Sequence, residues 1–223
     1  MQAVDYSQEL ETVFAHLETS ADGLSVDEAA DRLASLGANE IMFRKTPAWR
    51  RLLTQFYDPM VIILLITASI TAVLTYLGEH MLPDTLVIIG VVLLNALLGF
   101  VQEGKAEGAL DALRSMLVQE CLVIRSGTER RLPARELVPG DVVVLEAGDK
   151  IPADIRFIRV SNLHADESSL TGESVPVQKI TAALTGHDLV PGDQRNTGFS
   201  GTYISQGTAM AVVIATGNQT AFG

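Results

Sequence analysis

The chain has 223 residues, 48% of them hydrophobic and 19% charged, and its mean hydropathy of +0.27 is more apolar than that of an ordinary soluble domain. The formal net charge of −11 argues against nucleic-acid binding, because a phosphate-contacting surface needs clustered Lys and Arg. The single cysteine, Cys121, excludes an internal disulfide and a multi-cysteine zinc site, and we expect no metal site in this chain. The first residues carry Asp5, Glu9 and Glu11 without a basic segment, so no secretory signal peptide is expected.

Residues 1–44 predict a small helical domain. An apolar repeat at helical spacing begins at Leu10 and ends at Leu17. Ser25 and Glu28 then have the spacing of a capping box, in which each side chain caps the backbone of the other residue. An apolar helical face follows them, before a glycine that ends the helix. We interpret this region as a surface helical hairpin without chemistry of its own.

Two long uncharged runs follow, at residues 59–78 and 85–102, separated by a short acidic connector. Each run is long enough to cross a hydrocarbon core of about 30 Å at about 1.5 Å per residue. Neither run has the polar face that a helix of a soluble protein would show. Residues 45–118 therefore predict a transmembrane hairpin with these two spans.

Basic residues flank the hairpin but are absent from its connector, which carries Glu79 and Asp84. The positive-inside rule then predicts that both termini are cytoplasmic, and we expect the membrane to be the plasma membrane. The flanking basic residues are Arg44, Lys45, Arg50, Arg51, Lys105 and Arg114.

The second span is expected to continue as a helical stalk to about residue 118. Apolar residues keep the i, i+3, i+4, i+7 spacing as far as Leu117, while charged residues begin to alternate with them. A helix from Thr85 to Leu117 would be about 50 Å long, with about 20 Å standing clear of the hydrocarbon. Asn95, an amide deep in the apolar run, could line an ion path or join neighbouring helices, and we favour the second role.

From Glu120 onward, short apolar runs are separated by Gly, Pro and Asp turns, which predicts an all-β sandwich or jelly-roll-like domain over residues 119–223. With the helical segments before it, this gives an α+β membrane protein. The strands are expected at 121–125 and 129–132, joined at Gly127, then at 142–145, 155–160, 202–204 and 209–216, the last two paired around Gln206-Gly207. We interpret Asp141, Asp149 and Asp154 as turn-forming rather than catalytic residues.

One stretch of this β region combines carboxylates and hydroxyls around a glycine. Gly172 allows the backbone to turn tightly. Glu173 follows it between the hydroxyls of Thr171 and Ser174, and a carboxylate on an exposed turn can orient a water and accept its proton. For these four residues alone, we favour the simpler interpretation of a solvated turn.

The longer string Asp-Glu-Ser-Ser-Leu-Thr-Gly-Glu-Ser-Val-Pro-Val at 166–177 resembles the actuator-domain signature of P-type ion-pumping ATPases. The resemblance runs from about residue 20 to the last residue. The further matching segments are Gly-Leu-Ser at 23–25 and Gly-Ala-Asn at 37–39, similar to the N-terminal cation-ATPase domain, then Pro-Gly-Asp at 139–141, Gly-Asp-Lys-Ile-Pro-Ala-Asp at 148–154 and Gly-Thr at 201–202.

This resemblance implies that Glu173 positions the water that hydrolyses an aspartyl phosphate in a separate domain, while Thr171, Gly172 and Ser174 shape the loop. It also implies ATP and Mg²⁺ as cofactors of a complete pump, with none bound by this chain. The implied partners are the lipid bilayer, the phosphorylation and nucleotide domains, further transmembrane helices and the transported cation. The pattern is closer to the pumps for Ca²⁺, Mn²⁺, Na⁺ or K⁺ than to heavy-metal pumps, which usually carry Cys-rich modules.

The sequence contains neither the Asp-Lys-Thr-Gly-Thr loop of the phosphorylated aspartate nor a Gly-x-x-x-x-Gly-Lys-Ser/Thr loop. We therefore expect this chain alone not to hydrolyse ATP, and we interpret it as the N-terminal part of a P-type ATPase that contributes to dephosphorylation. The alternative is a non-catalytic, membrane-anchored actuator-like domain that binds or regulates a partner.

Overall fold

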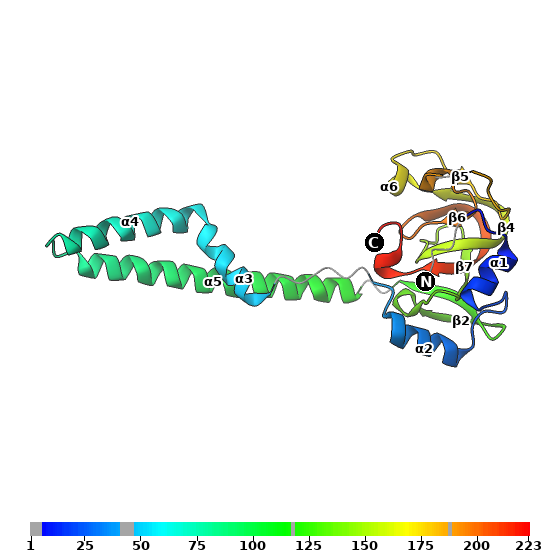
Figure 1. Cartoon of the computed structure of the whole chain (residues 1–223), viewed down its shortest axis with the longest axis horizontal. Coiled ribbons are helices and arrows are strands. Elements are labelled where there is room, and N and C mark those ends of the chain that lie inside the picture. Colours follow the sequence, from blue (N-terminus) through cyan, green and yellow to red (C-terminus); the bar gives the residue numbers. More distant parts are fainter. Residues whose placement is uncertain (1–5, 41–46, 117–118, 187–188) are drawn as a thin grey trace. The chain divides into compact units, whose positions relative to one another are not determined.

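The computed structural model describes residues 6–40, 47–116, 119–186 and 189–223. The chain divides into two compact units, one drawn from residues 1–42 and 118–223 and the other from residues 43–117 (Figure 1). The N-terminal helical region thus shares a unit with the β-rich region. Arg44, Lys45 and Leu117, which carried part of the sequence argument, lie outside the described residues.

The unit of residues 43–117 is a helical hairpin. Its elements are α3 (Ala48–Thr54), the 3₁₀ turn η1 (Gln55–Tyr57), α4 (Pro59–Tyr76) and α5 (Leu82–Met116). Helix α4 begins where Asp58 caps it, its Oδ1 accepting from the Met60 N–H at 2.9 Å, and Pro59 occupies the first turn, where a missing N–H is harmless. The predicted continuous second helix is confirmed, since α5 has 35 residues without a break.

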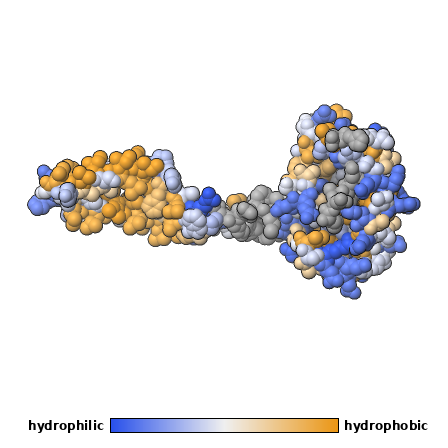
Figure 2. Space-filling model, viewed as in Figure 1, coloured by the Kyte–Doolittle hydropathy of each residue, from blue (hydrophilic) through white to orange (hydrophobic). Residues whose placement is uncertain are grey.

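Both long helices are apolar enough and long enough to cross a membrane, and only 11% of each apolar window is buried within the structure. Figure 2 shows hydrophobic residues covering the visible face of this hairpin. The two helices meet through small and hydroxyl side chains, and the Thr85 hydroxyl donates to that of Thr71 at 2.9 Å. Asn95 is exposed, whereas Val92 and Ala96 are buried, so Asn95 does not join α4 to α5.

Polar contacts join α3 and η1, the segment that precedes α4, to helix α5. The guanidinium of Arg51 pairs with Glu107 and lies 5.3 Å from the centre of the Phe100 ring. The Gln55 amide donates to Glu103 Oε2 at 2.9 Å. Glu103 and Glu107 of α5 therefore have partners within their own unit.

The N-terminal helices are α1 (Leu10–Leu17) and α2 (Val26–Leu36). The predicted capping box is confirmed: the Glu28 N–H donates to Ser25 Oγ at 3.2 Å, and the Ser25 N–H donates to Glu28 Oε2 at 2.9 Å. Hydrogen bonding of the Glu28 carboxylate to the side chain and then the backbone of Ser25 lowers the pKa of this carboxyl group. Helix α1 buries Val13 and Leu17 against Val212 of the sheet.

The β-rich region forms one antiparallel sheet in the order β2-β1-β3-β7-β4-β5, with β6 paired to β4 beside this path (Figure 1). The strands are β1 (Glu120–Arg125), β2 (Thr128–Pro133), β3 (Val142–Glu146), β4 (Asp154–Asp166), β5 (Val177–Gln178), β6 (Thr197–Gly198) and β7 (Tyr203–Ala215). The connections include η2 (Ala134–Glu136), α6 (Ser168–Thr171), η3 (Pro191–Asp193) and η4 (Gly217–Gln219). The predicted α+β class, with two apolar helices and an antiparallel β region, is confirmed.

The long strands β4 and β7, neighbours in the sheet, contribute many side chains to the main core. Their inward side chains pack with those of β1 and β3, including Val123, Val143, Phe157, Leu163 and Val213, all buried. Burying such side chains against one another is the largest favourable contribution to a domain of this kind.

The prediction of two strands paired around Gln206-Gly207 is wrong, because β7 runs without a turn from Tyr203 to Ala215. Gly207 instead lies at a β-bulge: the register with β4 shifts between Ser161 and His164, so two β4 residues oppose one on β7. A Cβ at Gly207, whose φ is +86°, would lie 2.4 Å from the carbonyl oxygens of Ser161 and Asn162. The glycine therefore serves a close backbone approach and not a hairpin turn.

The three carboxylates interpreted as turn-forming all hold backbone or arginine partners. Asp149 Oδ2 accepts from the Glu146 N–H at 2.9 Å, which closes the turn after β3. Asp154 is buried and accepts from the N–H groups of Ser200 at 2.8 Å and Ala221 at 2.6 Å. Burial raises the pKa of Asp154, and its two hydrogen bonds act in the opposite direction.

Asn39 joins three separate segments of the first unit. Its amide nitrogen donates to the carbonyls of Ala134 at 3.0 Å and Pro152 at 2.9 Å. Its side-chain oxygen accepts from the Gly217 N–H at 2.9 Å. Asn39, which follows α2 in the sequence, is thereby bonded to η4, the turn that follows β7.

Candidate functional site

The segment with the predicted site residues leaves β4 and returns to it. It begins at Asp166, whose Oδ1 accepts from the Ser168 N–H at 3.0 Å, and continues through the single turn of α6. Hydrogen bonding to Ser168 lowers the pKa of Asp166. The segment ends at β5, which pairs antiparallel with β4. The site is thus a loop whose two ends are neighbours in the sheet.

Gly172 ends α6 in the left-handed conformation, with φ +78°. Its N–H donates to the Ser168 carbonyl at 2.9 Å, and a hydrogen bond of this kind usually pairs a free carbonyl at the C-terminus of a helix. A Cβ at Gly172 would meet nothing within 4 Å, so the backbone conformation and not lack of space requires the glycine here.

The structure joins two of the four predicted site residues, Thr171 and Glu173, through the Thr171 hydroxyl. Thr171 Oγ1 donates to the Glu167 carbonyl at 3.1 Å and accepts from the Glu173 N–H, also at 3.1 Å. Thr171, Gly172, Glu173 and Ser174 are all exposed. The backbone of Glu173 is fixed from behind while its carboxylate faces solvent, so the loop can present this group to something outside the unit.

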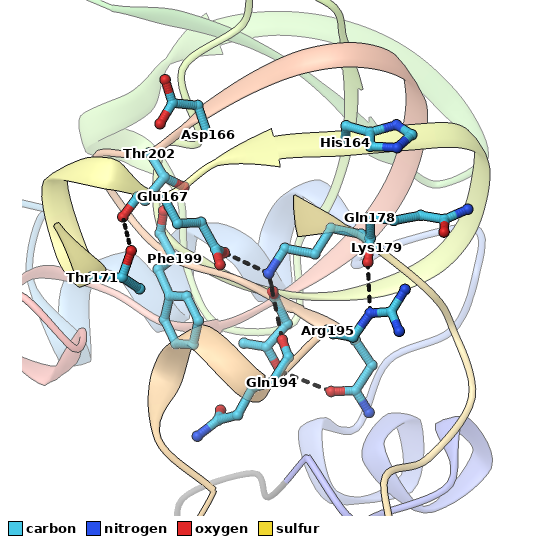
Figure 3. A network of polar contacts seen from close by, with 12 residues as sticks. His164, Asp166, Glu167, Thr171, Gln178, Lys179, Gln194, Arg195, Phe199 and Thr202 are labelled. Carbon is cyan, nitrogen blue, oxygen red and sulfur yellow. Dashed lines mark hydrogen bonds and ion pairs between the residues drawn. The ribbon is translucent and has the colours of Figure 1, made fainter. Parts of the chain in front are cut away.

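Beneath the loop lies a buried ion pair that the sequence analysis missed. Lys179 Nζ is 2.5 Å from Glu167 Oε1, and the two side chains are 0% and 1% exposed (Figure 3). One signal could have found the glutamate: Leu163, Ala165 and Glu167 alternate along β4 and are all buried, so the carboxylate continues the inward face of the strand. The sequence carries no comparable signal for the partner of that carboxylate.

Burial and pairing act in opposite directions on this pair. Burial raises the pKa of Glu167 and lowers the pKa of Lys179, and the charge of each partner opposes the shift of the other. Lys179 Nζ also donates to the Thr197 carbonyl at 2.9 Å and lies 5.7 Å from the centre of the Phe199 ring. These contacts favour the charged form of the lysine.

Metal binding finds no support in the arrangement of side chains. Within the four described stretches of the chain, no group of three or more His, Cys, Asp or Glu side chains could hold a metal ion. The loop itself carries one exposed carboxylate, that of Glu173, on a turn held by hydrogen bonds.

Comparisons with known proteins match this chain in two places. Residues 115–223 match the P-type ATPase actuator domain, and residues 5–71 match the N-terminus of cation transporters and ATPases. The loop and the sheet that holds it lie within the first of these matches.

Several curated proteins are similar over nearly the whole chain. "Probable cation-transporting ATPase F" of Mycobacterium tuberculosis is 45% identical over 202 residues, which are 90% of this chain and 22% of the relative. "Cation-transporting ATPase pma1" of Synechocystis is 40% identical over 215 residues, 96% of this chain and 23% of the relative. "Calcium-transporting ATPase 1" of Bacillus cereus is 39% identical over an alignment of 224 positions, gaps included, which covers 98% of this chain and 25% of the relative.

The chain thus spans about a quarter of the length of these relatives. The chain therefore belongs to the P-type cation-transporting ATPases and contains their N-terminal region and actuator domain.

Proposed function

We propose that this chain is the N-terminal part of an ATPase that couples ATP hydrolysis to cation transport across a membrane. Its Thr-Gly-Glu-Ser loop drives the dephosphorylation of an aspartyl phosphate held outside this chain. The observation that carries the proposal is the exposed Glu173 on a turn whose backbone is hydrogen-bonded from behind.

The proposed step uses Glu173 as a general base. Its carboxylate accepts a proton from a water molecule while the water oxygen bonds to phosphorus. The bond from phosphorus to the aspartyl oxygen breaks, and the products are inorganic phosphate and a free aspartate carboxylate. A covalent phosphoenzyme divides ATP hydrolysis into two steps, and the loop acts in the second.

The first step needs groups that other segments would supply. The sequence lacks the Asp-Lys-Thr-Gly-Thr loop, so we propose that ATP, Mg²⁺ and the phosphorylated aspartate belong to phosphorylation and nucleotide domains outside this chain. Further transmembrane helices and the transported cation would complete the set of partners. The printed names of the relatives, which refer to cation and calcium transport, support a cation as the cargo.

We further propose that α4 and α5 cross the plasma membrane and that both ends of the hairpin are cytoplasmic. Their length, apolar surface and low burial support the crossing. Arg50, Arg51 and Lys105 beside the spans, against an acidic connector, support the orientation.

The test is Glu173→Gln in a full-length polypeptide that carries the phosphorylated aspartate. With radiolabelled ATP, we expect normal phosphoenzyme formation and dephosphorylation slowed by about 10²- to 10⁴-fold, the usual contribution of a general base. Glu129→Gln is the matched control, since Glu129 is exposed on β2, outside the loop. Equal dephosphorylation rates in the two variants would instead favour the non-catalytic, partner-binding alternative.

A further inference from the structure

The ends of the Thr-Gly-Glu-Ser loop are joined at a buried point. Glu167 directly precedes α6, and Lys179 directly follows β5. Their side chains meet at 2.5 Å in the interior, so the ion pair closes the loop formed by residues 168–178. Figure 3 shows the two side chains reaching toward each other, joined by a dashed line.

The lysine end of this pair is fixed to the sheet. The Lys179 N–H donates to the Leu163 carbonyl of β4 at 2.9 Å. Its ammonium donates to the Thr197 carbonyl of β6 at 2.9 Å and contacts the Gln194 carbonyl at 3.5 Å. Lys179 is therefore held by several backbone segments, and its position does not depend on the loop.

The glutamate end is connected directly to the site residues. The Glu167 carbonyl accepts from the N–H groups of Leu170 and Thr171, each at 2.9 Å, and from the Thr171 hydroxyl. The same hydroxyl accepts from the Glu173 N–H. An unbroken series of contacts thus runs from the ammonium of Lys179 to the backbone of Glu173.

A second contact holds the same threonine from the other side. A Cβ at Gly192 would lie 2.8 Å from Thr171 Cγ2, so the turn η3 packs tightly against the methyl group. The threonine is thus held by its hydroxyl on one side and its methyl on the other. The position of Thr171 therefore depends on Glu167, whose backbone carbonyl accepts the hydrogen bond from the Thr171 hydroxyl.

The ion pair is a poor device for stability alone. Within the residues that the structure describes, the carboxylate of Glu167 has no hydrogen-bond partner apart from the contact with Lys179. Such a pair loses much of its Coulomb attraction to desolvation, and apolar side chains of similar size would serve a core as well. A charged pair fixes the relative orientation of its two side chains, which an apolar contact does not.

We propose that the Glu167–Lys179 ion pair is a clasp that holds the loop in the orientation in which Glu173 reaches the aspartyl phosphate. Glu167 and Lys179 are positioning residues, since they act through Thr171 and do not touch the reacting atoms. This inference rests on the proposed role of Glu173 in dephosphorylation.

The clasp makes a prediction for the unaltered chain. In detergent micelles, the amide hydrogens of Leu170 and Thr171 should exchange as slowly as that of Lys179, since all three are bonded to strand or loop-base carbonyls. Exchange of Leu170 and Thr171 at the rate of an unstructured peptide would overturn the proposal without any mutation.

The decisive variant is Glu167→Met combined with Lys179→Met, which removes both charges and leaves none buried alone. In the full-length polypeptide we expect phosphoenzyme formation to stay unchanged and dephosphorylation to slow by about 10- to 100-fold, because a small misplacement of a catalytic group has effects of this size. Glu167→Asp, which retains the charge on a shorter side chain, should give an intermediate rate. A purely structural role would lower both steps together or neither.

Glu173→Gln, measured in parallel, separates the two proposals. If that variant slows dephosphorylation while the double methionine variant does not, the clasp is wrong and the function stands. If Glu173→Gln has no effect, the proposed function fails. Hydrogen exchange of the Leu170 and Thr171 amides gives a second test. Faster exchange in the double variant would support the clasp, and unchanged exchange would show that the ion pair does not order the loop.

Discussion

Arg125 and Asp141 form a bidentate ion pair between β1 and the turn before β3. Arg125 Nε is 2.8 Å from Asp141 Oδ1, and Nη2 is 2.7 Å from Oδ2. The same Oδ2 accepts from the Val138 N–H at 3.0 Å. Asp141 is fully buried and the Arg125 side chain is 12% exposed, and the hydrogen bonds and charge of Asp141, against the effect of burial, raise the pKa of Arg125.

Replacement of Asp141 by Ala should therefore be strongly destabilising. The change leaves the guanidinium of Arg125 almost buried without its carboxylate, which typically costs about 3–5 kcal/mol. Thermal unfolding in detergent micelles measures the effect. Asp149→Ala is the control, since it removes one hydrogen bond at a partly exposed turn and should cost about 1 kcal/mol. Equal losses would show that the buried pair contributes no more than an ordinary turn.

Gly207→Ala tests the bulge between β4 and β7. The added Cβ would lie 2.4 Å from two carbonyl oxygens at a φ of +86°, and we expect a loss of about 3 kcal/mol or more from strain and overlap together. Gly148 is a matched control because its φ is +99° and a Cβ there meets nothing within 4 Å. Gly148→Ala should lower the free energy of unfolding only by the cost of placing alanine in the left-handed backbone conformation, about 1–2 kcal/mol. A Gly207→Ala variant as stable as Gly148→Ala would contradict the bulge.

The thiol of Cys121 should stay protonated at neutral pH. Burial first, and then the charge of Asp141, raise its pKa from 9.0 to about 12. We expect iodoacetamide to leave the folded chain unmodified at pH 8 and to alkylate the unfolded chain, because the thiolate is the nucleophile. Rapid alkylation of the folded chain would contradict this assignment.

The same shift makes stability depend on pH in the alkaline range. The unfolded thiol ionises near pH 9 and the folded thiol only near 12, so deprotonation favours the unfolded state as the pH rises between these values. The free energy of unfolding should fall by at most about 1.4 kcal/mol per pH unit from this group. Cys121→Ala should remove the dependence, which thermal unfolding across pH 8.5 to about 11 can measure.

The proposed membrane orientation is open to cysteine labelling. The native Cys121 is buried and gives little background. With a membrane-impermeant maleimide, His80→Cys in the α4–α5 connector should react on intact cells. Thr128→Cys, exposed at the β1–β2 turn, should react only after permeabilisation. The opposite pattern would reverse the orientation.

Much of the fold was predictable because its signals are local. The capping box at Ser25 and Glu28 needs only a spacing of three residues, and the hairpin at Gly127 needs only a glycine turn between two short strand segments. Helix α5 was predicted as continuous because Gly104 and Gly108 each weaken a helix by only about 1 kcal/mol relative to alanine, which a long apolar face readily offsets.

The errors arose where the answer depends on distant residues. Gly207 looks like a hairpin turn in isolation, and only the path of β4 around Asn162 shows that it is a bulge. Lys179 was missed because its burial depends on the distant carbonyls of Gln194 and Thr197, to which its ammonium is bonded. No local pattern specifies those contacts. They form because β5 and β6 both pair with β4, which brings segments distant in the sequence together.

The contacts of Asn39 determine how tension in the backbone would act on the β-rich unit. A pull on the chain beyond Glu40 would reach Asn39 before it reached α2. There the load would divide among the carbonyls of Ala134 and Pro152 and the N–H of Gly217, which belong to three separate loops of the sheet. Force entering at this point would therefore load three loops of the sheet at once, before it reached the N-terminal helices.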